Sequence, residues 1–137
     1  KKAPAIIVCD LWPASGAYTK ELLYEVAANS IVVSVCGGHL EGVGSANGNL
    51  PNGTGLEVRL MGEVGKAVAR QGMTRERANE IVLRLLEKYE HVFSMEGGNP
   101  GRSFEESYNM ETIEPVEGWQ KMYEEVKQEL AEMGIEF

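Results

Sequence analysis

The feature that most constrains the fold is one continuously apolar segment, Ala5 to Cys9, which ends at Asp10. A strand without alternating polar residues is typical of a parallel sheet that is covered on both faces. A loop containing Pro13 follows, and a helical pattern begins near Ala17. The rest of the chain is mostly helical in pattern, so it barely supplies the partner strands that the first strand requires.

Apolar residues at spacings of three and four predict four helices. The second follows Thr54-Gly55-Leu56-Glu57, which has the form of a capping box, and ends near Gly72. Thr74 is expected to cap the third, Pro115 to open the fourth and Gly134 to close it. The side chains expected to face the core are Leu22, Leu23, Val26, Ala27, Ile31, Leu60, Met61, Val64, Ala67, Val68, Ala78, Ile81, Val82, Leu85, Leu86, Tyr89, Phe93, Trp119, Met122, Tyr123, Val126, Leu130 and Met133.

Charge and composition argue against several classes of partner. The net charge of −8 repels phosphate backbones and anionic lipids, so nucleic acid and membrane surfaces are poor partners. No apolar run approaches the roughly 20 residues that a membrane span requires. Cys9 and Cys36 show no metal-ligand spacing, which favours a reduced, cytoplasmic setting and gives no metal site. Because the chain begins at Lys1 without a start methionine, we expect a segment upstream to have been removed.

The order strand, helix, glycine-rich loop, helix, helix, helix predicts an α/β fold. A complete eight-stranded barrel takes roughly 250 residues, and a doubly wound sheet needs several more strands than are visible. The 137 residues are therefore expected to be the C-terminal portion of a larger α/β protein. A nucleotide-binding fold of the flavodoxin type is a weaker alternative, based on the first strand and the loop that follows it.

Asp10 is the leading candidate for a catalytic residue. It follows the first strand, and in parallel α/β folds the carboxyl ends of the strands carry the chemistry. A carboxylate there can orient an ammonium group or act as a base, and Trp12 can offer an aromatic face to a cation. An equally good interpretation is that Asp10 only caps the following loop or helix.

The glycine-rich segment from Gly37 to Gly55 supplies the other candidates and is expected to be a long loop with one short strand. His39 and Glu41 place an imidazole and a carboxylate on it, where they can bind substrate or move a proton, although a lone loop histidine is most often solvated. Its glycines, from Gly42 onward, do not have the spacing of a dinucleotide fingerprint, so tight turns are the favoured interpretation.

Several segments, in the same order, resemble the C-terminal part of the monomethylamine:corrinoid methyltransferases, and the resemblance covers about nine tenths of the chain. They are Trp12-Pro13-Ala14, the run from Thr54 to Val64, Ser103 to Tyr108, Glu114-Pro115, Met122-Tyr123 and Gly134 to Phe137. The evidence is collinear order, since none of these segments is a catalytic signature.

The resemblance implies the C-terminal portion of a TIM-type (α/β)8 barrel followed by C-terminal helices. Residues 1–72 would supply the last strand and helix units, and residues 73–137 a helical extension. It implies methyl transfer from monomethylamine, or a related methylamine, to the Co(I) corrinoid of a partner protein. It also implies a homo-oligomer, no directly bound cofactor, and a pyrrolysine upstream of this chain.

In the family, a glutamine at the barrel mouth matches Asp10, which is a departure. The last barrel loop of the family aligns with a segment that contains Gly42, Gly44, Ser45 and Asn47, which would face the corrinoid partner, whereas His39 has no counterpart. The alternative to the enzyme is a non-catalytic fragment or interaction module that self-associates or pairs with another chain, because an isolated part of a barrel would expose apolar strand faces.

Overall fold

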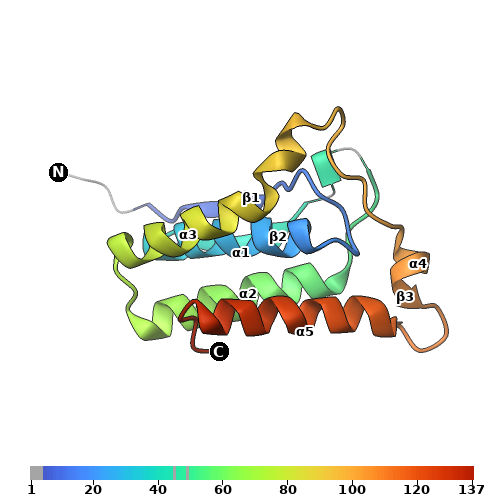
Figure 1. Ribbon diagram of the computed structural model, residues 1–137. Helices are drawn as coiled ribbons and strands as arrows, with labels where there is room; N and C mark the ends of the chain where they lie inside the picture. The colour runs from blue at the N-terminus through green and yellow to red at the C-terminus, as the bar shows by residue number, and fades with distance from the viewer. Residues whose placement is uncertain (1–4, 45, 49) are drawn as a thin grey trace.

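The computed structural model describes residues 5–44, 46–48 and 50–137. Its helices form layers over a small pair of strands, and both ends of the described chain lie on the left in Figure 1. In chain order, the elements are β1 (Val8–Leu11), α1 (Lys20–Val35), β2 (His39–Val43), the 3-10 turn η1 (Ala46–Gly48), α2 (Gly55–Gln71), α3 (Arg75–Tyr89), the 3-10 turn η2 (Glu90–Ser94), α4 (Phe104–Ser107), β3 (Tyr108–Asn109), β4 (Glu114–Pro115) and α5 (Glu117–Glu132).

β1, α1 and β2 form a parallel strand, helix, strand unit. Val8 pairs with His39, and after a shift in register Asp10 pairs with Gly42, so that Glu41 is the extra residue of a bulge. The apolar segment predicted as the strand lies a few residues too early, because pairing begins where the amide of His39 donates to the carbonyl of Ile7. The mixture of helices and parallel strands agrees with the predicted α/β class.

The two faces of this strand pair are covered unequally. Leu11 is buried against the helices, and the side chain of Leu40 lies against Gly65 of α2, where a Cβ would meet its Cδ1 atom at 2.4 Å. Ile6, Ile7 and Val8 are 79%, 61% and 52% exposed. The prediction that this segment is covered on both faces is therefore wrong for the described residues, because the helices pack against one face of the strand pair and leave these side chains open to solvent.

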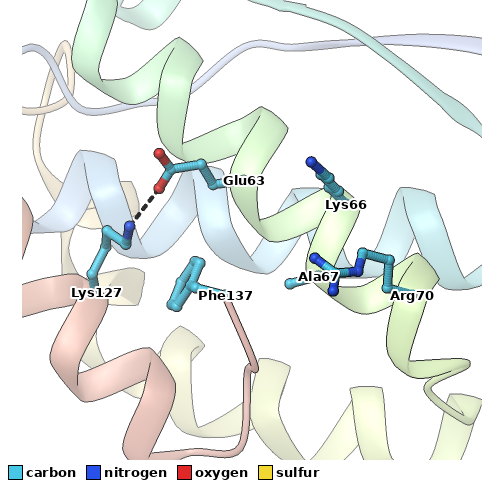
Figure 2. A pocket seen from close by; sticks show the side chains of 6 residues that line it. All are labelled: Glu63, Lys66, Ala67, Arg70, Lys127 and Phe137. Carbon is cyan, nitrogen blue, oxygen red and sulfur yellow. Dashed lines mark ion pairs between the residues drawn. The ribbon is translucent and has the colours of Figure 1, made fainter.

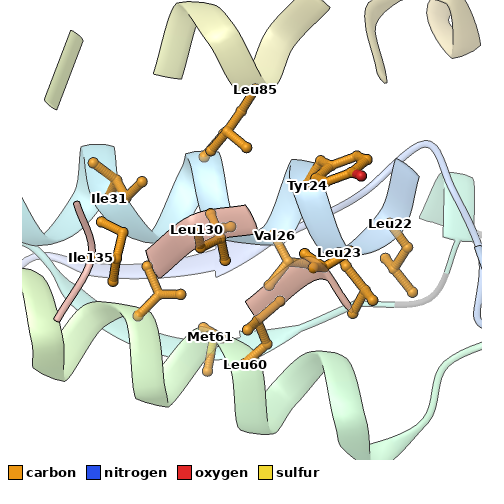
Figure 3. Close-up of a cluster of buried hydrophobic side chains, with 14 of the residues drawn as sticks. Leu22, Leu23, Tyr24, Val26, Ile31, Leu60, Met61, Leu85, Leu130 and Ile135 are labelled. Atoms are coloured by element: carbon orange, nitrogen blue, oxygen red, sulfur yellow. The ribbon is translucent and has the colours of Figure 1, made fainter. Parts of the chain in front are cut away.

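The core joins α1 to α2, α3 and α5, and side chains from these helices meet around α1 in Figure 3. The predicted inward residues are buried or partly buried, with the exception of Phe93, which is 59% exposed. The α-helix ends at Tyr89 and continues as the 3-10 segment η2, which has three residues per turn, so a spacing of four no longer reaches the core. Val92 is buried there instead.

The ends of the helices follow the predicted signals closely. Thr54 and Glu57 form the expected capping box, Gly72 ends α2 in the left-handed conformation and the hydroxyl of Thr74 caps α3. Pro115 does not open the last helix. It pairs with Tyr108 in a small hairpin, and α5 begins two residues later. No helix within the described ranges is both long and apolar enough to cross a bilayer.

Candidate functional site at the carboxyl ends of the strands

Four of the predicted site residues come together where β1 and β2 end. Asp10 pairs with Gly42, whose Cβ, if present, would lie 3.7 Å from the Asp10 carboxylate. The indole of Trp12 lies directly on Gly44, where a Cβ would come within 2.5 Å of the ring. Glycine is required at this second position because any side chain would displace the tryptophan.

These side chains form a polar and aromatic surface that solvent can reach. Asp10 is exposed, and Trp12 is 63% exposed although its ring covers Gly44. Asp10 faces Gly42 and Trp12 faces Gly44, so the carboxylate and the indole lie over neighbouring positions of the same segment. A carboxylate beside an aromatic face is suited to bind and orient a small organic cation.

His39 and Glu41 do not join this group. His39 opens β2 opposite Val8, three residues before the partner of Asp10, and Glu41 is the exposed bulge residue. Their side chains form no hydrogen bond or ion pair with a described residue. The expectation that both lie on a flexible loop is wrong, because pairing with β1 makes this segment a strand.

The predicted partner-facing loop is described only in part. Gly42 lies beside Asp10, and Gly44 lies beside Trp12. Asn47 falls within η1, whereas Ser45 lies outside the described residues. The prediction of one short strand within the glycine-rich segment is confirmed by β2.

Sequence analysis missed a loop that packs against the segment after Trp12, the loop from Gly97 to Gly101. The amide of Gly16 donates to the carbonyl of Asn99 at 2.8 Å, and the amide of Asn99 donates to the carbonyl of Ala14 at 3.1 Å. This loop and the loop after β1 therefore run side by side at the same end of the molecule as η1 (Figure 1). The cluster of glycines at positions 97, 98 and 101 was the available signal.

A third loop closes the same rim. The side-chain amide of Asn52 donates to the carbonyl of Pro100 at 2.7 Å, and the amide of Ala17 donates to the carbonyl of Asn52 at 2.9 Å. The loops after β1, before α2 and after η2 are thus connected by hydrogen bonds. We call these three segments (residues 12–18, 50–54 and 97–103) the rim loops.

Glu25 of α1 is the second feature that sequence analysis missed. It is only 5% exposed, and its two carboxylate oxygens accept from the amide of Ala14 at 3.0 and 3.1 Å. Burial raises the pKa of Glu25, and hydrogen bonds from the backbone of Ala14 and Ser15 act in the opposite direction. The available signal was an acidic residue inside the apolar run of the first helix.

The helical layer contains a separate charged pocket, shown in Figure 2, of about 240 Å³ between α2 and α5. None of the strand-end residues lines it. Burial alone would raise the pKa of Glu63, but hydrogen bonds from Lys127, Tyr123 and Arg59 lower it to about 2. Within the described ranges, no three His, Cys, Asp or Glu side chains are grouped so that they could hold a metal ion.

Comparison with known proteins gives a consistent result. Residues 5–135 match the family model described as monomethylamine methyltransferase MtmB. The chain is 34% identical over 128 residues to MtmB of Methanosarcina mazei and, with the same identity and coverage, to MtmB2 of Methanosarcina acetivorans; the match spans 92% of this chain and 27% of each relative. The chain thus spans about a quarter of the length of these relatives.

Solved structures lead to the same family. A crystal structure of the Methanosarcina barkeri monomethylamine methyltransferase superposes with a TM-score of 0.83 at 28% identity, covering 96% of this chain and 28% of that one. A crystal structure of a hydroxylamine complex of MtmB matches with the same values.

Proposed function

Because the chain belongs to the monomethylamine methyltransferase MtmB family, we propose that it supplies the C-terminal part of an (α/β)8 barrel enzyme. The enzyme would move a methyl group from monomethylamine, or a related methylamine, to the cobalt of a corrinoid that a partner protein carries. The corrinoid is then a substrate delivered to the barrel mouth and not a resident group of this chain. Residues 1–72 would complete the barrel, and residues 73–137 would form the helical extension.

The observation that carries the proposal is the meeting of Asp10, Trp12 and Gly44 at the carboxyl ends of two parallel strands. In barrel enzymes this edge carries the active site. Among the described residues one edge of β1 has no partner strand, and this edge, together with the exposed Ile6 and Ile7, fits a sheet that continues in a longer protein.

In the proposed mechanism, Asp10 attracts the cationic amine and Trp12 borders it, so that the methyl carbon is presented in line to Co(I). The methyl group passes to cobalt, and the amine nitrogen leaves as ammonia. A pyrrolysine is expected upstream of this chain to hold the amine. Asp10 occupies the position of a family glutamine, and an anionic carboxylate can attract an alkylammonium or a protonated imine but cannot donate as an amide does.

The remaining parts of the proposal concern partners and setting. The segment that contains Gly42, Gly44, Ser45 and Asn47 would face the corrinoid protein. His39 and Glu41 would contact the substrate from β2, at positions that precede Gly42. We also propose a homo-oligomeric protein of the cytoplasm.

The test is methyl transfer by the longer protein that contains this chain, followed through the absorbance of the corrinoid. Asp10→Ala is expected to lower kcat/KM by roughly tenfold or more, because the amine loses an orienting charge. Glu111→Gln, an exposed position on the turn between β3 and β4, is the matched control. Unchanged turnover would remove Asp10 from the site, and a wild-type protein without methyl transfer would contradict the function itself.

A second candidate is favoured by the exposed apolar residues of β1. A non-catalytic module would use the unpaired edge of β1 and residues such as Ile6 and Ile7 to pair with a second copy. Light scattering on the 137-residue chain separates the two proposals when it is combined with the transfer assay. If the 137-residue chain forms stable dimers, and the longer protein is also dimeric but transfers no methyl group, the non-catalytic module is favoured.

A further inference from the structure

We infer that Glu25 is a positioning residue for the barrel mouth: by holding the backbone of Ala14, its carboxylate sets the place of Trp12 over Gly44. The positional part of this inference stands on the structure alone. Its consequence for catalysis rests on the proposed function. Glu25 does not face the substrate, so it would act through the loop that carries Trp12.

Glu25 is a buried carboxylate with no cation beside it among the described residues. It is 5% exposed, and no described Lys, Arg or His forms an ion pair with it. Removing a carboxylate from water is unfavourable unless hydrogen bonds replace the lost hydration. Here the replacement comes from the backbone of the loop after β1, chiefly from Ala14. An apolar residue would fill the same place in the helix without this cost, which indicates that the bonds to the loop are what the carboxylate supplies.

Ala14 is held from the opposite side as well. Its carbonyl accepts from the amide of Asn99, and Gly98 lies so close that a Cβ there would come within 2.2 Å of the Ala14 oxygen. Gly16 approaches Pro100 in the same manner, with its Cβ position 2.0 Å from a carbonyl oxygen. The loop after β1 is therefore clamped between α1 and the loop of residues 97–101, with little room to move.

The clamp on Ala14 acts on the site through Trp12. Ala14 lies two residues after Trp12, and the indole of Trp12 rests on Gly44 with ring atoms at 2.5 to 2.8 Å from the Cβ position. A small displacement of Ala14 would thus slide or lift the ring. The hydroxyl of Ser15, fully buried and without a hydrogen-bond partner in the described part of the chain, lies in the same segment and offers no substitute anchor.

The experiment is ¹⁹F NMR of the longer protein labelled with 5-fluorotryptophan, because Trp12 and Trp119 then report separately on the mouth and on the core. Trp12→Phe and Trp119→Phe assign the two resonances. In Glu25→Gln, the carboxamide can offer only one acceptor to the loop. The Trp12 resonance is expected to shift or broaden while the Trp119 resonance stays in place.

Glu21→Gln is the matched control, one turn earlier on the same helix. The carboxylate of Glu21 lies 3.5 Å from His91 and forms no hydrogen bond with a described residue of the loop after β1. It is expected to leave both resonances unchanged. An unmoved Trp12 resonance in Glu25→Gln overturns the inference. If that variant does not fold, Gly98→Ala tests the same link by pushing on Ala14 from the other side, and an unmoved Trp12 there overturns it equally.

The transfer assay then separates position from catalysis. Glu25→Gln is expected to lower kcat/KM about tenfold, since misplacing a site wall by an ångström can cost that much or more. Glu21→Gln should retain the wild-type value. A fall in kcat/KM with an unmoved Trp12 resonance contradicts the inference. A wild-type protein without transfer contradicts the proposed function alone, since the NMR result does not depend on activity.

Discussion

The two faces of the β1–β2 pair differ in how far the described chain completes them. On the helical side, Leu11 and Leu40 pack into a core in which Trp119 is fully buried. On the other side, Val8 and Trp12 are more than half exposed. The difference indicates that the helical layer holds this part of the protein together, whereas the open side carries residues whose role depends on what else covers them.

The two tryptophans give the largest expected contrast between these regions. Trp119→Ala should lower the free energy of unfolding by about 3 to 5 kcal/mol, because it empties a buried site between Tyr18 and Thr54. Trp12→Ala should change it by less than about 0.5 kcal/mol. Urea denaturation followed by circular dichroism measures both. Similar values for the two variants would mean that the mouth, like the core, is a structural element.

Ile7→Ala tests whether the open side becomes covered. In the 137-residue chain the side chain is 61% exposed, so a change below about 0.5 kcal/mol is expected. In the longer protein, additional strands would bury it, and the same substitution should cost about 2 to 5 kcal/mol. The difference between the losses of unfolding free energy in the two proteins shows whether Ile7 becomes covered. A small effect in both would contradict the barrel.

Two neighbouring glycines show how tightly the rim loops are packed. Both Gly97 and Gly98 have positive φ, but only Gly98 faces a neighbour, the carbonyl oxygen of Ala14. Gly97→Ala should therefore cost about 1 kcal/mol for its backbone conformation alone. Gly98→Ala should cost about 2 to 3 kcal/mol, because the new methyl group also overpacks the loop. Equal losses would show that the loops are not in firm contact.

Sequence analysis predicted the helical layer well, because its signals are local. Caps at Thr54 and Thr74, the glycine after α2 and the spacing of apolar residues each act over a few residues. The same reasoning failed at Phe93, where the helix tightens to a 3-10 turn, and at Pro115, which pairs in a hairpin. Both errors lie at element boundaries, which depend on neighbours that are distant in the sequence.

The candidate site was predictable only in part, for the same physical reason. Asp10 and Trp12 follow an apolar strand, and the rule that chemistry lies at the carboxyl ends of parallel strands selected them, whereas Gly44 was selected only through the family resemblance. The contact between the loops around Ala14 and Asn99 joins residues about 85 positions apart, and no local pattern encodes it. Glu25 stands in an apolar helical run, where only the structure reveals that its partner is a backbone amide.

The smallest expected effect is on the stability of the fold in acid. It compares Glu63 and Glu25, two carboxylates whose pKa values are shifted in opposite directions. Glu63, in the helical layer, is only partly exposed and accepts from Lys127 and Arg59, and its pKa is lowered from 4.5 to about 2. A lowered pKa in the folded state means that the ionised group stabilises the fold above pH 4.5, and that this contribution is lost as the pH falls toward 2. Glu25 has the opposite shift.

Thermal unfolding between pH 5 and about pH 2.5 measures this difference. In Glu63→Gln, the decrease in the free energy of unfolding between these two pH values should be smaller by about 1 kcal/mol than in the wild type. This value allows for screening by solvent at a side chain that is 27% exposed. Glu111→Gln, which forms no ion pair with described residues, should leave the dependence unchanged. Glu25→Gln should not reduce the loss of stability in acid. A carboxyl whose pKa is raised in the folded state loses its stabilisation as the pH rises and not as it falls. If Glu63→Gln loses as much stability in acid as the wild type, the cations around Glu63 contribute little to the stability of the fold. Hydrophobic packing alone would then distinguish the helical layer from the open face.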